Sequence, residues 1–284
     1  MKVGIQLYSV RNSMANDPIG TLKEVAEIGY KNIEIANHNA EVDPGVGFNV
    51  SAEEINKTLQ ECGAKVISGH VFPFRAETMD AILAYHAQIG TKFLVMPMDF
   101  YADRDEVLRK SEILNNVGAK CREAGIEFVY HNHFHEFQEF GGKTIYEMIM
   151  ENTDPQNLKI ELDSYWALRG GQDIASFMKK YGKRIRLLHQ KDFPAQYKDQ
   201  FNLIEAVHKN APVVDLTYFE SVVSDDTFTE IGHGILNIQG IINTATEHCD
   251  VEYIILEQDF SKLGELESLK VSMESFKKFN GIEW

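Results

Sequence analysis

Histidines and carboxylates, with one lysine among them, recur in this chain at the ends of short apolar runs, where they could bind a metal ion or transfer protons. The residues placed in this way are His70, His131, His133, Asp163, His189, Lys191 and Glu257. Imidazole and carboxylate groups together suit a divalent metal ion, and imidazole also titrates near neutral pH. Because these residues lie far apart in the sequence, they can act together only in a fold that gathers the ends of several strands.

The segments around these residues alternate between β-rich runs and amphipathic helical stretches. We predict strands over residues 3–10, 31–36, 65–70, 92–98, 126–133, 158–163, 185–191 and 252–258. Helices are predicted over residues 18–28, 51–62, 76–89, 105–124, 144–151, 174–181, 238–248 and 263–279. Several of the strand segments are apolar nearly throughout, as expected for strands that are covered on both faces.

Eight strand–helix units in a chain of 284 residues fit a barrel of eight units, which typically needs roughly 250 residues. No glycine-rich turn follows the first strand segment, so a dinucleotide-binding sheet has no support. We therefore predict an α/β protein with the (β/α)8 TIM-barrel fold, in a single domain over residues 1–284.

Residues 193–229 interrupt this alternation and form an insertion after the seventh strand, with a short helix predicted over residues 201–209. An insertion at this point lies on the catalytic face of a barrel. It is either a lid or substrate wall, or a surface excursion without a role.

The active site of such a barrel lies at the carboxyl ends of its strands, where the chemically active residues are found. Side chains alternate along a strand, so His131 and His133 are expected to share one face. One of these two histidines, His131 or His133, would then surround one divalent ion together with Asp163, His189 and Glu257. Mn, Zn, Co, Fe and Mg all accept nitrogen and oxygen ligands, so the identity of the metal stays open.

The composition restricts the classes of partner. Lys and Arg number 28 against 43 Asp and Glu, for a net charge of −15, and such a charge disfavours nucleic acid and anionic membranes. The three cysteines form no metal-binding pair, and no segment reaches the roughly 18 apolar residues of a membrane span. We therefore expect a cytoplasmic protein that binds a small molecule; a homo-oligomer is left open.

Several short motifs then point to a known family. They are residues 4–11 (GIQLYSVR), 68–70 (SGH), 130–133 (YHNH), 161–166 (ELDSYW), 189–192 (HQKD), 230–234 (EIGHG) and 257–259 (EQD). In this order and spacing the chain resembles the sugar phosphate isomerase/epimerase superfamily of xylose isomerase-like TIM barrels, and its inosose dehydratase-like branch. The resemblance covers essentially the whole chain.

The resemblance implies a metal ion held at the ends of strands five to eight by Glu, Asp, His and Glu. Asp163, His189 and Glu257 match the last three positions. The first position holds His131 in place of the glutamate of many epimerases, so either His131 or His133 would be the fourth ligand. A two-glutamate epimerase mechanism therefore lacks one of its groups.

We thus expect a metal-dependent isomerase, epimerase or lyase that abstracts a proton next to the carbonyl of a sugar, keto-sugar or inosose. Glu257 or a strand-five histidine, His133, would be the base, and Lys191 would neutralise developing negative charge. Five further residues would bind the sugar or polyol, through hydroxyl contacts or through the faces of aromatic rings: Gln6, Glu34, His70, Tyr165 and Trp166.

Two other functions remain as alternatives. One is a metal-dependent hydrolase like the endonuclease IV phosphodiesterases, which typically gather more ligands and present a basic face to DNA; the negative charge disfavours it. The other is a sugar-binding barrel without turnover.

Overall fold

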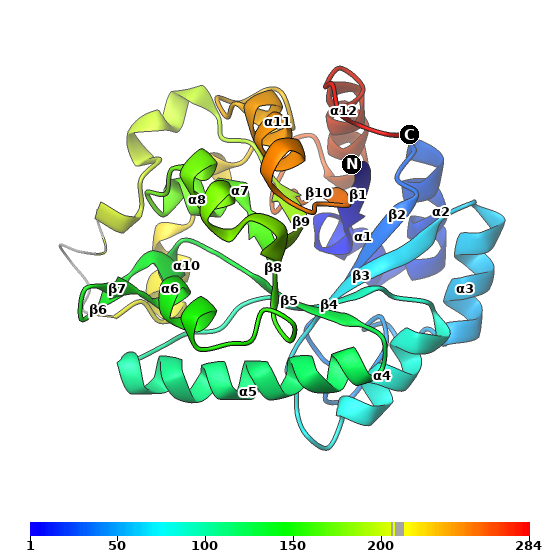
Figure 1. The fold of residues 1–284 in the computed structure, drawn as a ribbon. Coiled ribbons are helices and arrows are strands. Elements are labelled where there is room, and N and C mark those ends of the chain that lie inside the picture. Colours follow the sequence, from blue (N-terminus) through cyan, green and yellow to red (C-terminus); the bar gives the residue numbers. More distant parts are fainter. Residues whose placement is uncertain (206, 208–212) are drawn as a thin grey trace.

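Eight parallel strands close into a barrel in the computed structural model, which describes residues 1–205, 207 and 213–284 (Figure 1). In the order of their pairing, the barrel strands are β1 (Lys2–Gln6), β10 (Tyr253–Leu256), β9 (Ile185–Gln190), β8 (Lys159–Asp163), β5 (Glu127–His131), β4 (Phe93–Met96), β3 (Lys65–Val71) and β2 (Asn32–Asn37). Strand β1 pairs with both β10 and β2, which closes the sheet on itself. The predicted TIM barrel is confirmed.

Helices connect the strands and surround the barrel (Figure 1). Those in the described residues are α1 (Arg11–Asn16), α2 (Pro18–Ile28), α3 (Ala52–Glu61), α4 (Met79–Gln88), α5 (Arg104–Glu123), α6 (Ile145–Glu151), α7 (Ser164–Arg169), α8 (Ile174–Tyr181), α10 (Leu216–Val222), α11 (Ile238–His248) and α12 (Glu265–Phe276). None of these is both long enough and apolar enough to cross a membrane.

Local sequence explains where many of these helices begin. Asp17 accepts the backbone N–H of Gly20 at 2.9 Å and Pro18 occupies the first turn of α2, an arrangement that favours helix initiation. Helix α6 begins with a capping box, in which Thr144 and Glu147 exchange hydrogen bonds. A small hairpin of β6 (Glu139–Phe140) and β7 (Lys143–Thr144) precedes α6.

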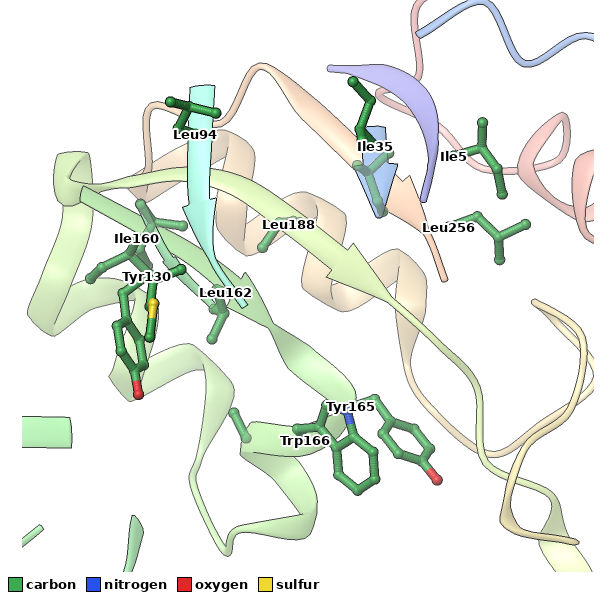
Figure 2. Close-up of a cluster of buried hydrophobic side chains, with 14 of the residues drawn as sticks. Ile5, Ile35, Leu94, Tyr130, Ile160, Leu162, Tyr165, Trp166, Leu188 and Leu256 are labelled. Carbon is green, nitrogen blue, oxygen red and sulfur yellow. The ribbon is translucent and has the colours of Figure 1, made fainter. Parts of the chain in front are cut away.

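Apolar side chains fill the molecule on both sides of the strands. The larger cluster lies between strands and helices, and Figure 2 shows Leu94, Leu188 and Leu256 among its members. A separate buried cluster, drawn from five strands, fills the inside of the barrel: Ile67, Phe93, Val95, Val129, Leu187, Tyr253 and Ile255. Because side chains alternate, residues two positions further along the same strands also point inward, toward the carboxyl end of the barrel.

Five of the predicted strands end earlier than expected, and three of these differences concern residues of the site. The first was predicted over residues 3–10, but β1 ends at Gln6, whose side chain accepts the N–H of Tyr8 at 3.1 Å and starts a 3-10 helix (Leu7–Val10). Strand β5 ends at His131, and the backbone N–H of His133 donates to Glu136 at 2.9 Å. His133 therefore lies outside the strand, and the prediction that strand alternation would place it on the same face as His131 was wrong. Strand β9 ends at Gln190, so Lys191 directly follows it.

The insertion after β9 packs over the mouth of the barrel. It contains a 3-10 helix (Ala195–Gln200), α10 and a second 3-10 helix (Asp225–Thr227). Phe219 of α10 contacts the rings of His133 and Trp166, with centroid distances of 5.3 and 5.8 Å. The helix predicted over residues 201–209 falls partly on residues 206, 208 and 209, which lie outside the described residues.

Candidate metal centre and active site

Four of the predicted metal ligands, His131, Asp163, His189 and Glu257, lie together at the mouth of the barrel. One ligand atom of each lies within 4.8 Å of those of the others, and all four residues are buried. His131 and Asp163 are the last residues of β5 and β8, His189 lies near the end of β9, and Glu257 directly follows β10. Two imidazoles and two carboxylates form a set that suits a divalent transition ion.

The register of β8 against β9 brings Asp163 and His189 side by side. The register shifts between Ile160 and Glu161, so that Glu161 pairs with Leu187 and Asp163 pairs with His189. Paired residues of parallel strands point to the same face, here the inside of the barrel. On the other side of β8, His131 pairs with Glu161.

Lys191 lies between two of these carboxylates. Its Nζ donates to Oδ2 of Asp163 at 2.7 Å and to Oε2 of Glu257, and Oδ1 of Asp259 lies 3.9 Å away. Burial by itself would lower the pKa of Lys191, but the surrounding carboxylates raise it well above its usual value. Lys191 is therefore a buried ammonium ion. We call Asp163, Lys191, Glu257 and Asp259 the outer group.

A second layer of charge lies on the other side of the two ligand imidazoles. We call Glu34, His70 and Glu161 the inner group. Nε2 of His70 lies 2.7 Å from Glu161 and 3.2 Å from Glu34. Nδ1 of His131 lies 3.1 Å from Glu161, and Nε2 of His189 lies 2.5 Å from Glu34. His131 and His189 thus separate the inner group from the outer group.

Glu34 is surrounded by donors from its neighbouring strands. Its Oε1 accepts the side-chain amide of Gln6 at 2.9 Å, and its Oε2 accepts the Ser68 hydroxyl at 2.5 Å. Gln6, Glu34 and Ser68 are register partners on β1, β2 and β3, and all three are fully buried. The structure therefore places Gln6 and Glu34 behind the histidines, bonded to protein groups.

The buried charges shift the proton affinities of this site. Burial raises the pKa of Glu161 to about 7, with a further contribution from the charge of Glu34. Burial acts in the opposite direction on His70, but Glu34 and Glu161 outweigh it and raise the pKa of His70 to about 9. Burial raises the pKa of Asp259 to about 7, because attraction by Lys191 is offset by repulsion from Glu257. Glu161 and Asp259 can therefore exchange protons near neutral pH.

His133 lies just beyond β5, beside His131, with a distance of 4.9 Å between the ring centroids. Within the described residues its Nδ1 is buried without a hydrogen-bond partner. Burial, with repulsion from neighbouring positive groups, lowers the pKa of His133 well below its usual value. The side chain is thus a neutral imidazole with one unpaired nitrogen.

Tyr165 and Trp166 project side by side from the chain just after β8 (Figure 2). The hydroxyl of Tyr165 donates to the backbone oxygen of Thr227 at 2.8 Å and so contacts the insertion. The ring of Trp166 lies 5.7 Å from Nζ of Lys191, and its Nε1 finds no partner in the described part of the chain. Trp166 therefore borders the outer group with one donor unsatisfied.

The residues present fit a divalent cation. Asp163 and Glu257 are buried carboxylates that both bind the ammonium of Lys191, so this position already demands positive charge. In the inner group, Oε1 of Glu161 is buried without a hydrogen-bond partner among the described residues. The donor set and the placement of charge both suit a metal.

Three residues of the site received no role in the sequence prediction. Glu161 and Asp259 stand two residues from predicted ligands on the same strand ends, and that spacing is the signal that could have identified them. Ser68 carries no such signal, because its role depends on the register between β2 and β3.

Comparisons with known proteins agree with this architecture. Inosose dehydratase of Mesomycoplasma hyopneumoniae is 25% identical over 284 residues, covering 93% of this chain and 88% of that protein. The crystal structure of a sugar phosphate isomerase/epimerase from Parabacteroides distasonis matches with a TM-score of 0.78 at 24% identity, covering 99% of this chain and 95% of that one. The IolI protein with a bound zinc atom matches with a TM-score of 0.70 at 15% identity, covering 97% and 96%.

The family model described as xylose isomerase-like TIM barrel matches residues 22–279, which include seven of the eight barrel strands. The resemblance inferred from the motifs is thereby confirmed. The chain belongs to the xylose isomerase-like TIM barrel family.

Proposed function

We propose that this protein is a metal-dependent enzyme that removes a proton next to the carbonyl of an inosose or a related keto-sugar, in a lyase or isomerase reaction. The observation that carries the proposal is the convergence of His131, Asp163, His189 and Glu257 at the mouth of the barrel. The relatives named inosose dehydratase favour a lyase, which eliminates water from its substrate.

The outer face of the site would hold the metal. Asp163, His189 and Glu257 would be ligands, with His131 as the fourth. When bound, a divalent ion supplies Lewis acidity that polarises a carbonyl and stabilises developing negative charge. Lys191 binds one oxygen of each of the two carboxylate ligands, so it would lie next to the metal.

The side chains around the metal would carry the protons. His133 or Glu257 would accept the proton from the carbon next to the carbonyl. In a dehydration, the electron pair of that C–H bond forms a carbon–carbon double bond as the bond to the neighbouring hydroxyl breaks. Lys191, as an ammonium ion, would give that leaving hydroxyl a proton, so that it departs as water. In an isomerisation the proton would instead return to a carbon of the substrate.

Substrate hydroxyls need partners at the mouth of the barrel. We propose Trp166 and His133 for this role, because Nε1 of Trp166 and Nδ1 of His133 are polar atoms without a protein partner in the described chain. His70 stays a candidate, while Gln6, Glu34 and Tyr165 already bond to protein groups. The insertion would limit the size of the substrate through Phe219, which packs on both Trp166 and His133.

Solvent deuterium exchange tests the proposal. Protein stripped with a chelator and reloaded with zinc, manganese or cobalt is incubated in deuterated buffer with 2-keto-myo-inositol and a panel of keto-sugars. NMR should show metal-dependent exchange or elimination at the carbon next to the carbonyl. Asp163→Asn should remove both metal binding and exchange, whereas Asp250→Asn, an exposed change before β10 at the opposite end of the barrel, should preserve both.

Two outcomes would reject the proposal. Metal-free protein that exchanges as fast as loaded protein would rule out the metal, and tight sugar binding without exchange would indicate a binding barrel.

The second candidate function, phosphodiester hydrolysis, is favoured by one observation: a second potential ligand group, His70, His131, Glu161 and His189, adjoins the first. Metal-dependent cleavage of bis(p-nitrophenyl) phosphate would support that alternative.

A further inference from the structure

The imidazoles of His131 and His189 each contact a carboxylate through both ring nitrogens. In His131, Nδ1 lies 3.1 Å from Glu161 and Nε2 lies 3.8 Å from Asp163. In His189, Nε2 lies 2.5 Å from Glu34 and Nδ1 lies 3.1 Å from Glu257. One nitrogen of each ring therefore faces the inner group, and the other faces the outer group.

The inner carboxylates can only accept hydrogen bonds when ionised. Oε1 of Glu34 already accepts from Gln6, and its Oε2 accepts from Ser68, so donors hold this carboxylate in place. When Glu161 is ionised as well, the nitrogens that face these two carboxylates must carry hydrogens to bond there: Nε2 of His189 and Nδ1 of His131. The nitrogens left to bind a metal are then Nδ1 of His189 and Nε2 of His131, on the side of Asp163 and Glu257. Nδ1 of His189 lies 3.1 Å from Glu257 and carries a hydrogen in the metal-free protein, so a metal ion bound there would displace that hydrogen.

From these contacts we infer that Glu34 and Glu161 are positioning residues that bind one nitrogen of His189 and of His131, so that the other nitrogen of each ring faces the outer group and is the one that binds a metal there. The inference rests on the proposed function, because it assigns these two outward-facing nitrogens to the proposed metal. A carboxylate behind a metal-binding histidine orients the ring and makes it a better ligand. Glu34 and Glu161 thus act through the histidines and do not touch the metal.

The same geometry makes the two potential ligand groups exclusive. Both groups use His131 and His189. A metal ion within the inner group would replace the hydrogens at Nδ1 of His131 and Nε2 of His189 and break their bonds to the carboxylates. It would also leave Asp163 and Glu257 with Lys191 as their cation. A metal bound by Asp163 and Glu257 and a metal bound by Glu161 therefore predict different effects of substitutions at these carboxylates on metal affinity.

Metal affinity distinguishes these arrangements without an assay of activity. Zinc dissociation constants are measured by competition with a chromophoric chelator in the full-length protein. Glu34→Gln and Glu161→Gln should each weaken zinc binding about 10- to 100-fold, whereas Asp163→Asn should abolish it. Ser68→Ala removes only a donor to Glu34 and should weaken zinc binding less than Glu34→Gln does, which gives a mild variant with an intact barrel.

Nitrogen-15 NMR of the histidine rings supplies a second readout, assigned by His131→Gln and His189→Gln. Metal-free wild-type protein should show a hydrogen on Nδ1 of His131, and zinc-loaded protein should show zinc on Nδ1 of His189. If Glu161→Gln abolishes zinc binding and Asp163→Asn retains it, Glu161 is a ligand and the inference is overturned. It is also overturned if Glu34→Gln and Glu161→Gln both bind zinc like the wild type.

Failure of the proposed function would look different. Wild-type protein that binds no metal would remove the proposed function, while the His131 tautomer and its loss in Glu161→Gln would still support the positioning role. Conversely, zinc binding together with a hydrogen on Nε2 of His131 in the metal-free protein would retain the metal and reject the positioning role.

Discussion

The carboxylate of Asp192 accepts the backbone N–H of Gly234 at 3.0 Å, across 42 positions of the chain. The same side chain accepts the backbone N–H groups of Gly232 and Leu236, at 3.0 and 3.1 Å. A Cβ atom at Gly234 would lie only 2.1 Å from Oδ1 of Asp192, so this contact requires glycine. Asp192 therefore anchors the segment that returns from the insertion to α11.

Asp192→Asn should destabilise the protein, because an amide offers one acceptor oxygen and turns its NH2 group toward N–H donors. We expect a loss on the order of 2–3 kcal/mol in the free energy of unfolding, measured by urea denaturation. Asp80→Asn, an exposed change in the first turn of α4, is the matched control. Equal stability of the two variants would show that Asp192 does not anchor the segment.

Arg169→Lys should loosen the insertion. The fully buried guanidinium of Arg169 donates to the backbone oxygens of Gln200 and Phe201, both at 3.2 Å, and to the Tyr165 hydroxyl at 2.9 Å. An ammonium ion cannot reproduce this planar set of donors. Limited trypsin digestion should therefore cleave the variant faster after the exposed Lys198, as followed by mass spectrometry. Arg109→Lys, at an exposed position, should digest like the wild type.

His86 should make the free energy of unfolding decrease as the pH is lowered. Burial lowers the pKa of His86 to about 4, while an unfolded chain binds this proton near pH ~6.5. As the pH falls from that value toward 4, the unfolded state takes up a proton that the folded state excludes, so the free energy of unfolding decreases. This decrease approaches about 1.4 kcal/mol per pH unit.

His86→Leu should remove that part of the slope in urea denaturation measured across this pH range. Thr91→Val removes only the partner of Nδ1, which lies 3.0 Å away, and should keep most of the slope. A slope that is unchanged in His86→Leu would contradict the prediction.

Trp166→Phe tests the unpaired indole N–H without removing the aromatic ring. If Nε1 donates to a substrate hydroxyl, the dissociation constant for 2-keto-myo-inositol should rise about 3- to 10-fold by calorimetry. Zinc affinity should not change, because Trp166 is not a proposed ligand. Trp284→Phe, at an exposed position, is the matched control. Unchanged sugar binding in both variants would mean that the indole does not contact the substrate.

The barrel and three members of the outer group, Asp163, Lys191 and Glu257, follow from patterns that are visible in the sequence. Asp163 and His189 end apolar strand segments, and the carboxyl ends of barrel strands meet at one mouth. Strand boundaries were less predictable. Strand β5 ends at His131 because the N–H of His133 bonds to the Glu136 side chain, a contact that alternation cannot reveal.

The inner group could not be predicted, because it depends on register. The pairing shifts between Ile33 and Glu34, which places Glu34 beside Ser68 in place of Ile67. A similar shift at Glu161 aligns Asp163 with His189. Such irregularities change which side chains meet, and no residue type in the sequence marks them. Roles assigned to Glu34 from its strand alone therefore missed its contact with His189.

The four candidate ligands come from four different strands, so no single strand–helix unit carries the site. A cut within the insertion would separate His131, Asp163 and His189 from Glu257. Two such fragments could recreate the full ligand set only by docking into one complete barrel. A bound ion would therefore favour the closed barrel over any partly assembled form. Metal affinity measured on a mixture of the two fragments would then show whether they have assembled into a barrel.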